Sequence, residues 1–579
     1  MSRQVQACQA EPRLALASQD STLPSDHHTG IPQALLALEA RLRQAAPHIT
    51  AERSVDHSLD TEQRIWDHLD ILLAAVADPS RMAQRWLLLT AVLMRFPTTA
   101  QLLAFTRMLS ERTADSCANY LLDQALATPA HLLMATMRIV TDQPVVDVGF
   151  TACHDTHTGI PRVVRETLSR WEAAHAIVPV AWTQQNACYR SLLPGEHDRV
   201  FHFGQHSEQV AQASAYDWAM HAQACQLIVP FGTTLVCPDV AVTNQATAAL
   251  AQFSGNTVSY IAYDLIPLTA ADLRPAVDVE ATARWFATVK HAHKVAGISA
   301  SATAEMAGMV SALPTQGLQG PDVRQVELPA QASHLPPQDT GADKTNLTST
   351  GPAEGLGHTG GTGPSGGSGQ AGGMVQAGDG QAHEGRAENG TAGDDGAAGR
   401  RPVIALIGTL EPHKNQRTVL HAAHRLWHEG LDFEVRQIGG RGWDTQIFDQ
   451  AASRLIADGF PLTLMGRVSE QTLWDQLRAA DAAVFISLHE GYGLPVAEAL
   501  SVGTPVITSN YGSQAQIASH GGCLTVDPRD DASVTHALRR IITQPELRAQ
   551  LVDQIAHRPT STWDNYADSL WAYLVEGAH

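Results

Sequence analysis

Residues 487–510 read SLHEGYGLPVAEALSVGTPVITSN, and the order of residue types in this stretch decides the fold class. The apolar run AAVFISL predicts a buried strand, which a glycine-containing loop follows. Pro495 then lies in the first turn of the expected helix, where its missing N–H has no intrahelical partner to lose. Gly503 and Pro505 end this helix before the next strand. The order strand, loop, helix predicts a parallel α/β sheet with the loop at the carboxyl end of a strand.

This loop has the properties of a site for a ligand that carries both phosphate and hydroxyl groups. Free N–H groups and the helix dipole at the helix start attract a pyrophosphate. Glu490 and Glu498 flank the turn, and their charge suits hydroxyls better than phosphates because like charges repel. We expect Glu490 to accept hydrogen bonds from a sugar ring and Glu498 to hold a ribose. A ligand with sugar, pyrophosphate and ribose in a row is a sugar nucleotide.

The same alternation of strands and helices continues on both sides of the loop. From Pro402 onward, helical segments separate the runs VIALIG, FEVRQIG, LTLMG, AAVFISL and PVITS. From Asp147 onward, the runs VVDVGF, AIVPVAW, RVFHF and TVSYIAY alternate with helical stretches such as RVVRETLSRWEA and ATARWFATVKHAHKV. Such βαβ patterns predict two doubly wound Rossmann-like domains.

Two regions differ from this pattern. From Ile31 to Leu126, apolar residues recur at three- and four-residue spacing, which predicts several packed helices. Gly, Ala, Thr, Ser and Asp dominate the segment before Arg400, which has too few large apolar residues to fold. The predicted organisation is a helical accessory region (1–140), an N-terminal Rossmann-like acceptor domain (141–330), a low-complexity disordered linker (331–400) and a C-terminal Rossmann-like donor-nucleotide domain with a closing helix (401–579).

Composition narrows the function classes. The chain has 579 residues with 44% hydrophobic and 17% charged residues, typical of a globular enzyme, and a net charge of -20 that argues against nucleic-acid binding. The seven cysteines are scattered, odd in number and form no CxxC pair, which favours a reducing compartment without structural zinc. We see neither a signal peptide nor a membrane span, and we therefore expect a cytoplasmic protein.

The stretch around Glu490 resembles the donor-site signature of retaining GT-B glycosyltransferases of family 4, in which seven residues separate two glutamates. Further donor-domain elements of that family are similar to IGTLEPHKNQRTVLHAAHRLW (407–427), IGGRGW (438–443) and MGRVSEQTLWDQLRAADAAVFIS (465–487). The resemblance implies a GT-B fold, in which two Rossmann-like domains face a cleft, here with an all-helical N-terminal extension.

The first half resembles a mannosyltransferase-like subgroup of this family. The elements that carry this resemblance are VDVGFTACHDTHTGIPRVVRETL (146–168) and YDLIPL (263–268). The final WDNYADSLWAYL resembles the helix that crosses back to the first domain. The similarity covers about 147–329 and 402–575.

The resemblance implies a role for each matching residue. Lys414 is expected to neutralise the donor pyrophosphate, and Asp264 to be a polar group at the reacting centre, with capping of the following turn as its alternative. His413 replaces the usual arginine of the subgroup, so charge neutralisation is expected to be weaker or pH dependent. The expected catalytic residues are Asp264, Glu490 and Lys414; the expected donor-binding residues are Gly159, Arg162, His413, Lys414, Arg467, Glu490, Gly491, Tyr492, Gly493, Leu494 and Glu498.

The expected activity is a retaining transfer of a hexose, mannose from GDP-mannose, to a polysaccharide or lipid-linked oligosaccharide acceptor. In such transferases the leaving phosphate helps to take the acceptor proton, and the protein supplies positioning and charge stabilisation. A UDP-hexose donor, or a non-catalytic GT-B scaffold in a polysaccharide assembly complex, are the alternatives. We expect no metal or other cofactor, because Lys414 and the helix terminus replace the cation. A lipid-linked acceptor implies peripheral association with the inner face of the membrane.

Overall fold

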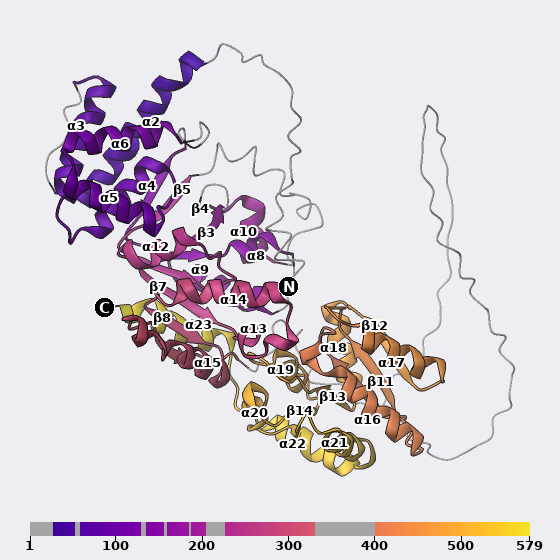
Figure 1. Cartoon of the computed structure of the whole chain (residues 1–579). Coiled ribbons are helices and arrows are strands. Elements are labelled where there is room, and N and C mark those ends of the chain that lie inside the picture. Colours follow the sequence, from indigo (N-terminus) through magenta and orange to yellow (C-terminus); the bar gives the residue numbers. More distant parts are fainter. Residues whose placement is uncertain are drawn as a thin grey trace, which may run out of the picture. The chain divides into compact units, whose positions relative to one another are not determined.

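The computed structural model describes residues 27–51, 58–128, 132, 135–155, 159–183, 187–203, 226–329 and 400–578. It contains an N-terminal helical region and two α/β parts, each with its own mainly or entirely parallel sheet (Figure 1). This confirms the fold class expected from the sequence. The predicted linker lies outside the described residues, apart from Arg400.

The helical region follows the apolar spacing of its sequence. Its helices are α2 (His27–Ile49), α3 (Thr61–Val76), α4 (Met82–Leu93), α5 (Thr99–Glu111) and α6 (Ala114–Leu126). Side chains that accept hydrogen bonds from backbone N–H groups cap three helix starts, at Asp60, Thr98 and Thr113. Helix α4 is buried on nearly all sides, which agrees with its continuous apolar sequence.

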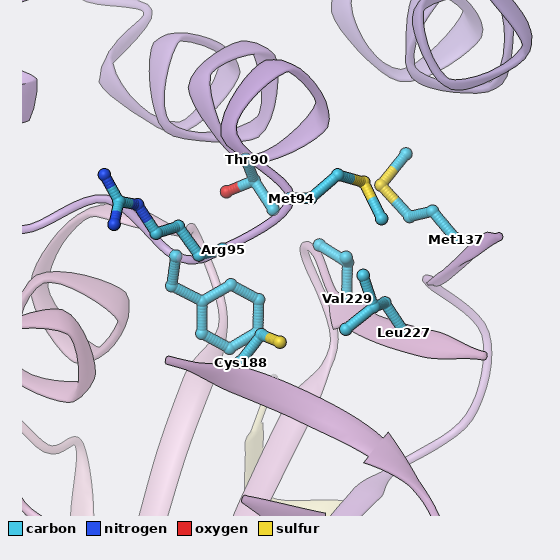
Figure 2. A pocket seen from close by; sticks show the side chains of 8 residues that line it. Thr90, Met94, Arg95, Met137, Cys188, Leu227 and Val229 are labelled. Atoms are coloured by element: carbon cyan, nitrogen blue, oxygen red, sulfur yellow. The ribbon is translucent and has the colours of Figure 1, made fainter. Parts of the chain in front are cut away.

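The helical region packs onto the first sheet and shares a hydrophobic core with it. Phe96 lies between the two, because its ring is 5.1 Å from that of Trp86 on α4 and 5.7 Å from those of Trp182 and Tyr189 on the sheet. Figure 2 shows a small pocket at this seam, lined by Thr90, Met94, Arg95, Phe96, Met137, Cys188, Leu227 and Val229. Its exposed lining is apolar, so we interpret it as a packing gap.

The first sheet has nine strands in the order β1-β5-β4-β3-β2-β6-β7-β8-β9. Its neighbouring pairs are parallel, except that β4 runs antiparallel to both β3 and β5. The strands are β1 (Met137–Val140), β2 (Val145–Asp147), β3 (Val178–Thr183), β4 (Cys188–Ser191), β5 (Leu227–Pro230), β6 (Thr234–Cys237), β7 (Thr257–Ala262), β8 (Lys294–Gly297) and β9 (Asp322–Gln325). The helices are α8 (Gly149–Cys153), α9 (Ile160–Ala174), α10 (Pro194–Phe201), α12 (Gln245–Phe253), α13 (Ile266–Thr269), α14 (Ala276–Val289) and α15 (Ala300–Val310).

Two sequence-based predictions in this part are wrong. The run RVFHF was expected to be a strand, but it covers the end of α10 and the residues after it. The physical reason is the helix start, where Pro194 occupies the first turn and the Glu196 carboxylate accepts a hydrogen bond of 2.8 Å from the N–H of Leu193. The helical stretch expected through Val295 ends at Val289, and its last residues form a turn and the start of β8.

The second sheet is entirely parallel, with the order β12-β11-β10-β13-β14-β15. Its strands are β10 (Val403–Ile407), β11 (Glu434–Ile438), β12 (Leu462–Gly466), β13 (Ala482–Phe485), β14 (Val506–Ser509) and β15 (Cys523–Val526). Its helices are α16 (Gln416–His428), α17 (Gln446–Ala457), α18 (Glu470–Ala479), α19 (Leu494–Ser501), α20 (Gly512–Ala518), α21 (Asp531–Thr543) and α22 (Pro545–Ala556). The five predicted strands are confirmed, whereas the edge strand β15 was missed. This order reverses between β10 and β13, the place where open α/β sheets bind ligands.

The last helix, α23 (Trp563–Leu574), returns to the first α/β part and packs on α9 and β8, as expected from the sequence. Trp171 donates from its indole N–H to the carbonyl of Ala567 at 3.0 Å, and the Ser259 hydroxyl donates to the carbonyl of Leu574 at 3.3 Å. Across the described ranges, no helix combines the length and the apolar character that a membrane crossing requires.

Candidate functional site

Lys414 and Glu490 meet at the point where the second sheet reverses its strand order. The chain after β10 forms a short 3-10 turn that ends at Lys414, and the chain after β13 leads to Glu490. The Lys414 Nζ donates to the Glu490 carboxylate, and the two side chains are only 17% and 10% exposed. The sequence predicted both residues for the site, and the fold brings them together from strands that are far apart in the chain.

The turn that leads into α19 presents several backbone N–H groups that have no partner among the described residues. Gly493 precedes the helix with a φ of 103°, a conformation that favours glycine. The first N–H in this turn with a backbone partner is that of Val496, which donates to Gly493. Within the described residues, no hydrogen bond is donated by the N–H groups of Gly491, Tyr492, Gly493 and Leu494. Such groups at a helix start are suited to an anion.

Side chains from both α/β parts fix the carbonyl side and the ring of the same loop. Ser299 donates to the carbonyl of Gly491 at 2.5 Å, and Ser513 donates to that of Glu490 at 2.9 Å. The buried Tyr492 donates from its hydroxyl to the carbonyl of Leu328 at 2.7 Å. Residues of both α/β parts therefore hold the loop in place.

A second ion pair joins the two α/β parts. Arg162 on α9 donates to the carboxylate of Glu498 on α19, and their side chains are 7% and 13% exposed. Arg162 therefore lies inside the molecule and not on an exposed helix face. Gly159, three residues earlier, has a φ of 60° at the start of α9, and a Cβ there would meet no described residue within 4 Å.

Asp264 both caps a turn and lies beside the donor loop. Its carboxylate accepts a hydrogen bond of 3.1 Å from the N–H of Ile266, which is the alternative role considered from the sequence. Burial raises the pKa of the Asp264 carboxyl; the hydrogen bond from Ile266 opposes this shift, and the charge of Glu490 adds to it. A Cβ on Gly491 would approach the Cβ of Asp264 to 3.1 Å. Asp264 and the loop thus occupy one site.

The predicted donor-binding residue His413 differs from expectation, whereas the role of Arg467 stays a prediction. His413 is buried, and its burial, with the charges of Lys414 and Arg274, lowers its pKa to about 2. It is therefore neutral at physiological pH, and the pH-dependent charge considered from the sequence is not supported. Its ring stacks on Trp443 with centroids 5.7 Å apart. Arg467 is exposed and makes no hydrogen bond or ion pair within the part of the chain that the structure describes.

Further residues of the site lie outside the sequence motifs and were not predicted from the sequence. The ring nitrogen Nε2 of His489 is 2.5 Å from the Glu305 carboxylate on α15. Arg274 places its guanidinium 4.2 Å from the centre of the Trp443 ring and 3.8 Å from the Glu411 carboxylate. His489 lies within the quoted loop and was a visible signal, but no local pattern distinguishes Glu305 or Arg274.

Among the described residues, one group has the side-chain types and spacing of a metal site. His197, Asp198 and His202 on and after α10 place their ligand atoms within 4.8 Å of one another. His197 contacts Glu172 at 3.0 Å, and His202 contacts Asp198 at 3.3 Å. These contacts account for the arrangement without an ion, and we assign no metal to it.

The comparison with protein families places a match in the second α/β part. Residues 393–558 match the family described as Glycosyl transferases group 1. The O-antigen chain mannosyltransferase B of Escherichia coli is 32% identical over 161 residues, which cover 28% of this chain and 42% of that protein. The serotype-specific mannosyltransferase WbdA of Escherichia coli is 23% identical over 383 residues, which cover 65% and 39%. The chain thus spans about two fifths of the length of these curated relatives.

Among solved structures, sucrose-phosphate synthase from Thermosynechococcus elongatus is 13% identical, with a TM-score of 0.42 and coverage of 75% of this chain and 96% of that one.

The family match covers the segment from β10 to α22 together with the loops that carry Lys414 and Glu490. The similarity to group 1 glycosyl transferases therefore covers the same segment as the candidate site.

Proposed function

We propose that this protein is a hexosyltransferase that uses a nucleotide sugar as its donor. The observation that carries the proposal is the convergence of Lys414, Glu490 and the unpartnered N–H groups of α19 where the parallel sheet reverses its order. A cation beside a helix start suits a diphosphate, and a carboxylate beside both suits sugar hydroxyls. The match to group 1 glycosyl transferases over the same segment supports the proposal.

In the proposed reaction, Lys414 and the start of α19 stabilise the charge that develops on the leaving diphosphate. Glu490 orients the sugar, and Glu498 binds the ribose by exchanging its contact with Arg162 for one with a hydroxyl. Arg162 is then close enough to the donor to contribute a second positive charge. Asp264 supplies a polar group from the first α/β part at the reacting centre. We propose retention of configuration, with the donor phosphate helping to accept the proton of the acceptor hydroxyl.

We propose mannose from GDP-mannose as the transferred group and a polysaccharide or lipid-linked oligosaccharide as the acceptor. Two relatives named as mannosyltransferases, one of them of O-antigen chains, support this choice. The proposal places the reaction in the cytoplasm, at the inner face of the membrane for a lipid-linked acceptor. It includes no requirement for a metal, and the test is whether a chelator leaves turnover unchanged.

Thermal unfolding and donor hydrolysis across a panel of GDP- and UDP-sugars test the function. A ligand that binds the native state raises stability by mass action, about 2.7 kcal/mol at a hundredfold excess over Kd. We expect stabilisation and turnover with GDP-mannose, loss of both in Glu498→Ala, and no change in Glu470→Ala, an exposed glutamate in the same domain. Turnover only with a UDP-hexose would change the donor. A folded protein that no nucleotide sugar stabilises would support the scaffold alternative.

A further inference from the structure

The carboxylate of Glu305 connects the two halves of the site. Glu305 lies on α15 of the first α/β part, and its side chain is 14% exposed. One carboxylate oxygen contacts Nε2 of His489 at 2.5 Å, and the other accepts a hydrogen bond of 3.0 Å from the N–H of Leu265. His489 immediately precedes Glu490 in the donor loop, and Leu265 immediately follows Asp264. One side chain therefore contacts the neighbours of both expected site carboxylates.

The surroundings of His489 favour its charged form. Three carboxylates surround His489: Glu305 on α15, Asp264 in the turn after β7, and Glu490 in the same loop. The neighbouring His413, in the turn after β10, is neutral. The hydrogen bond to Glu305 raises the pKa of His489, burial opposes this shift, and the negative charges of the surrounding carboxylates add to it. A charge-assisted hydrogen bond of this kind is stronger and more directional than one between neutral groups.

The backbone around this contact leaves little room for adjustment. A Cβ on Gly491 would overlap with the carbonyl oxygen of Tyr263, so the donor loop and the turn after β7 approach each other directly. A small change in the relative position of the two segments would therefore change the distance between Asp264 and Glu490. Misplacing reacting groups by about 1 Å costs on the order of 100-fold in rate.

We propose that Glu305 is a positioning residue, which holds the turn of Asp264 and the donor loop of Glu490 in register through Leu265 and His489. The inference rests on the proposed transferase function. Glu305 itself does not touch the substrate in this proposal. It acts through the two segments that it joins, and the bond to His489 is strongest while His489 is protonated.

The test compares Glu305→Gln, His489→Gln and the double variant with the unmodified protein. We expect Glu305→Gln to lower kcat about 10- to 100-fold with little change in the donor KM, because the donor-binding groups of the loop keep their positions relative to one another while their position relative to Asp264 changes. As pH rises, the activity of Glu305→Gln should also begin to fall at a lower pH than that of the unmodified protein. The reason is that His489 loses the partner that raises its pKa. The double variant should be no worse than His489→Gln, since both substitutions alter the same contact and a glutamine at position 305 can still accept the hydrogen bond from Leu265.

The matched control is Glu280→Gln, an exposed glutamate on α14 that pairs with Arg284 of the same helix. NMR titration of the His489 ring gives a second readout, and we expect its pKa to fall in Glu305→Gln but not in the control. An unchanged kcat and an unchanged His489 titration in Glu305→Gln would overturn the inference while leaving the proposed function intact. Fully additive losses in the double variant would overturn it as well. Absence of turnover by the unmodified protein with every donor would refute the proposed function itself, and the inference with it.

Discussion

The carboxyl groups at the carboxyl ends of the two sheets have different partners, which are backbone N–H groups in the first sheet and a lysine in the second. In the first sheet, Asp147 ends β2 and Asp239 follows the neighbouring β6; both are buried, and neither forms a salt bridge with any described residue. Burial raises the pKa of both, to about 7 for Asp147, against the opposing hydrogen bonds from backbone N–H groups. In the second sheet, Glu490 after β13 is paired with Lys414 after β10.

From this difference we infer which of the two sheets can hold a charged ligand at its carboxyl end. Backbone N–H groups supply the hydrogen bonds of the two aspartates at the first sheet. The N–H of Gly149 donates to Asp147 at 3.1 Å, and that of Thr151 donates to Asp239 at 2.6 Å. The second sheet keeps a cation, a carboxylate and free N–H groups together. The charge of the proposed diphosphate donor therefore matches the groups at the second sheet.

The largest expected effect comes from removing the cation of the second sheet. We expect Lys414→Met to lower kcat/KM with the nucleotide sugar about 100- to 1,000-fold, because a preorganised charge at the leaving group is lost and Glu490 is left unpaired. Lys414→Arg should retain part of the activity. Steady-state kinetics measure both, with Lys290→Met as the control for loss of a lysine elsewhere. Full activity of Lys414→Met would remove the distinction between the two sheets.

The contact between the halves gives the next effect. Gly491→Ala would place a Cβ against the carbonyl of Tyr263, a backbone atom that cannot rotate away. We expect the loop to shift and kcat to fall about 10- to 100-fold, with the protein still folded. Gly308→Ala on α15, where a Cβ meets open space, is the matched control and should be neutral or slightly stabilising. Equal activity of the two variants would contradict the close approach.

The ion pair across the two parts should have a smaller effect. Arg162→Met leaves the mostly buried Glu498 without its cation, and we expect donor affinity to fall about tenfold. A double-mutant cycle with Glu498→Gln should give a coupling of about 1–3 kcal/mol in the free energy of unfolding. A coupling near zero would mean that the two side chains do not interact in solution.

The buried acid of the first sheet should affect stability and pH dependence more than catalysis. The folded pKa of Asp147, about 7, lies above its ordinary value of 3.8, so the native state binds the extra proton between these values. The free energy of unfolding should therefore fall as pH rises from about 4 to about 7. Asp147→Asn should flatten this part of the profile, measured by denaturant unfolding at each pH. An identical slope in both proteins would show that Asp147 is ionised in the native state.

The sequence predicted elements well where short-range rules decide them. Alternating apolar runs, Pro495 in a first helical turn and the loop glycines act within a few residues, so the five strands of the second sheet were predicted correctly. RVFHF failed because its apolar residues suit either structure, and the helix start at Pro194 decides between them. The reversed direction of β4 could not be predicted, because the pairing of a strand depends on tertiary contacts and not on its own residues.

The sequence by itself determined the two α/β parts, the helical region and the side chains Lys414, Glu490 and Asp264 as candidates for one site. Only the tertiary structure decided that Glu498 pairs with Arg162, 336 positions away, and that Glu305 contacts His489. It also decided that His413 is buried and neutral, and that the helices share a core with the first sheet. The physical reason is range: backbone conformation responds to neighbours along the chain, whereas charge partners and burial depend on which surfaces pack together.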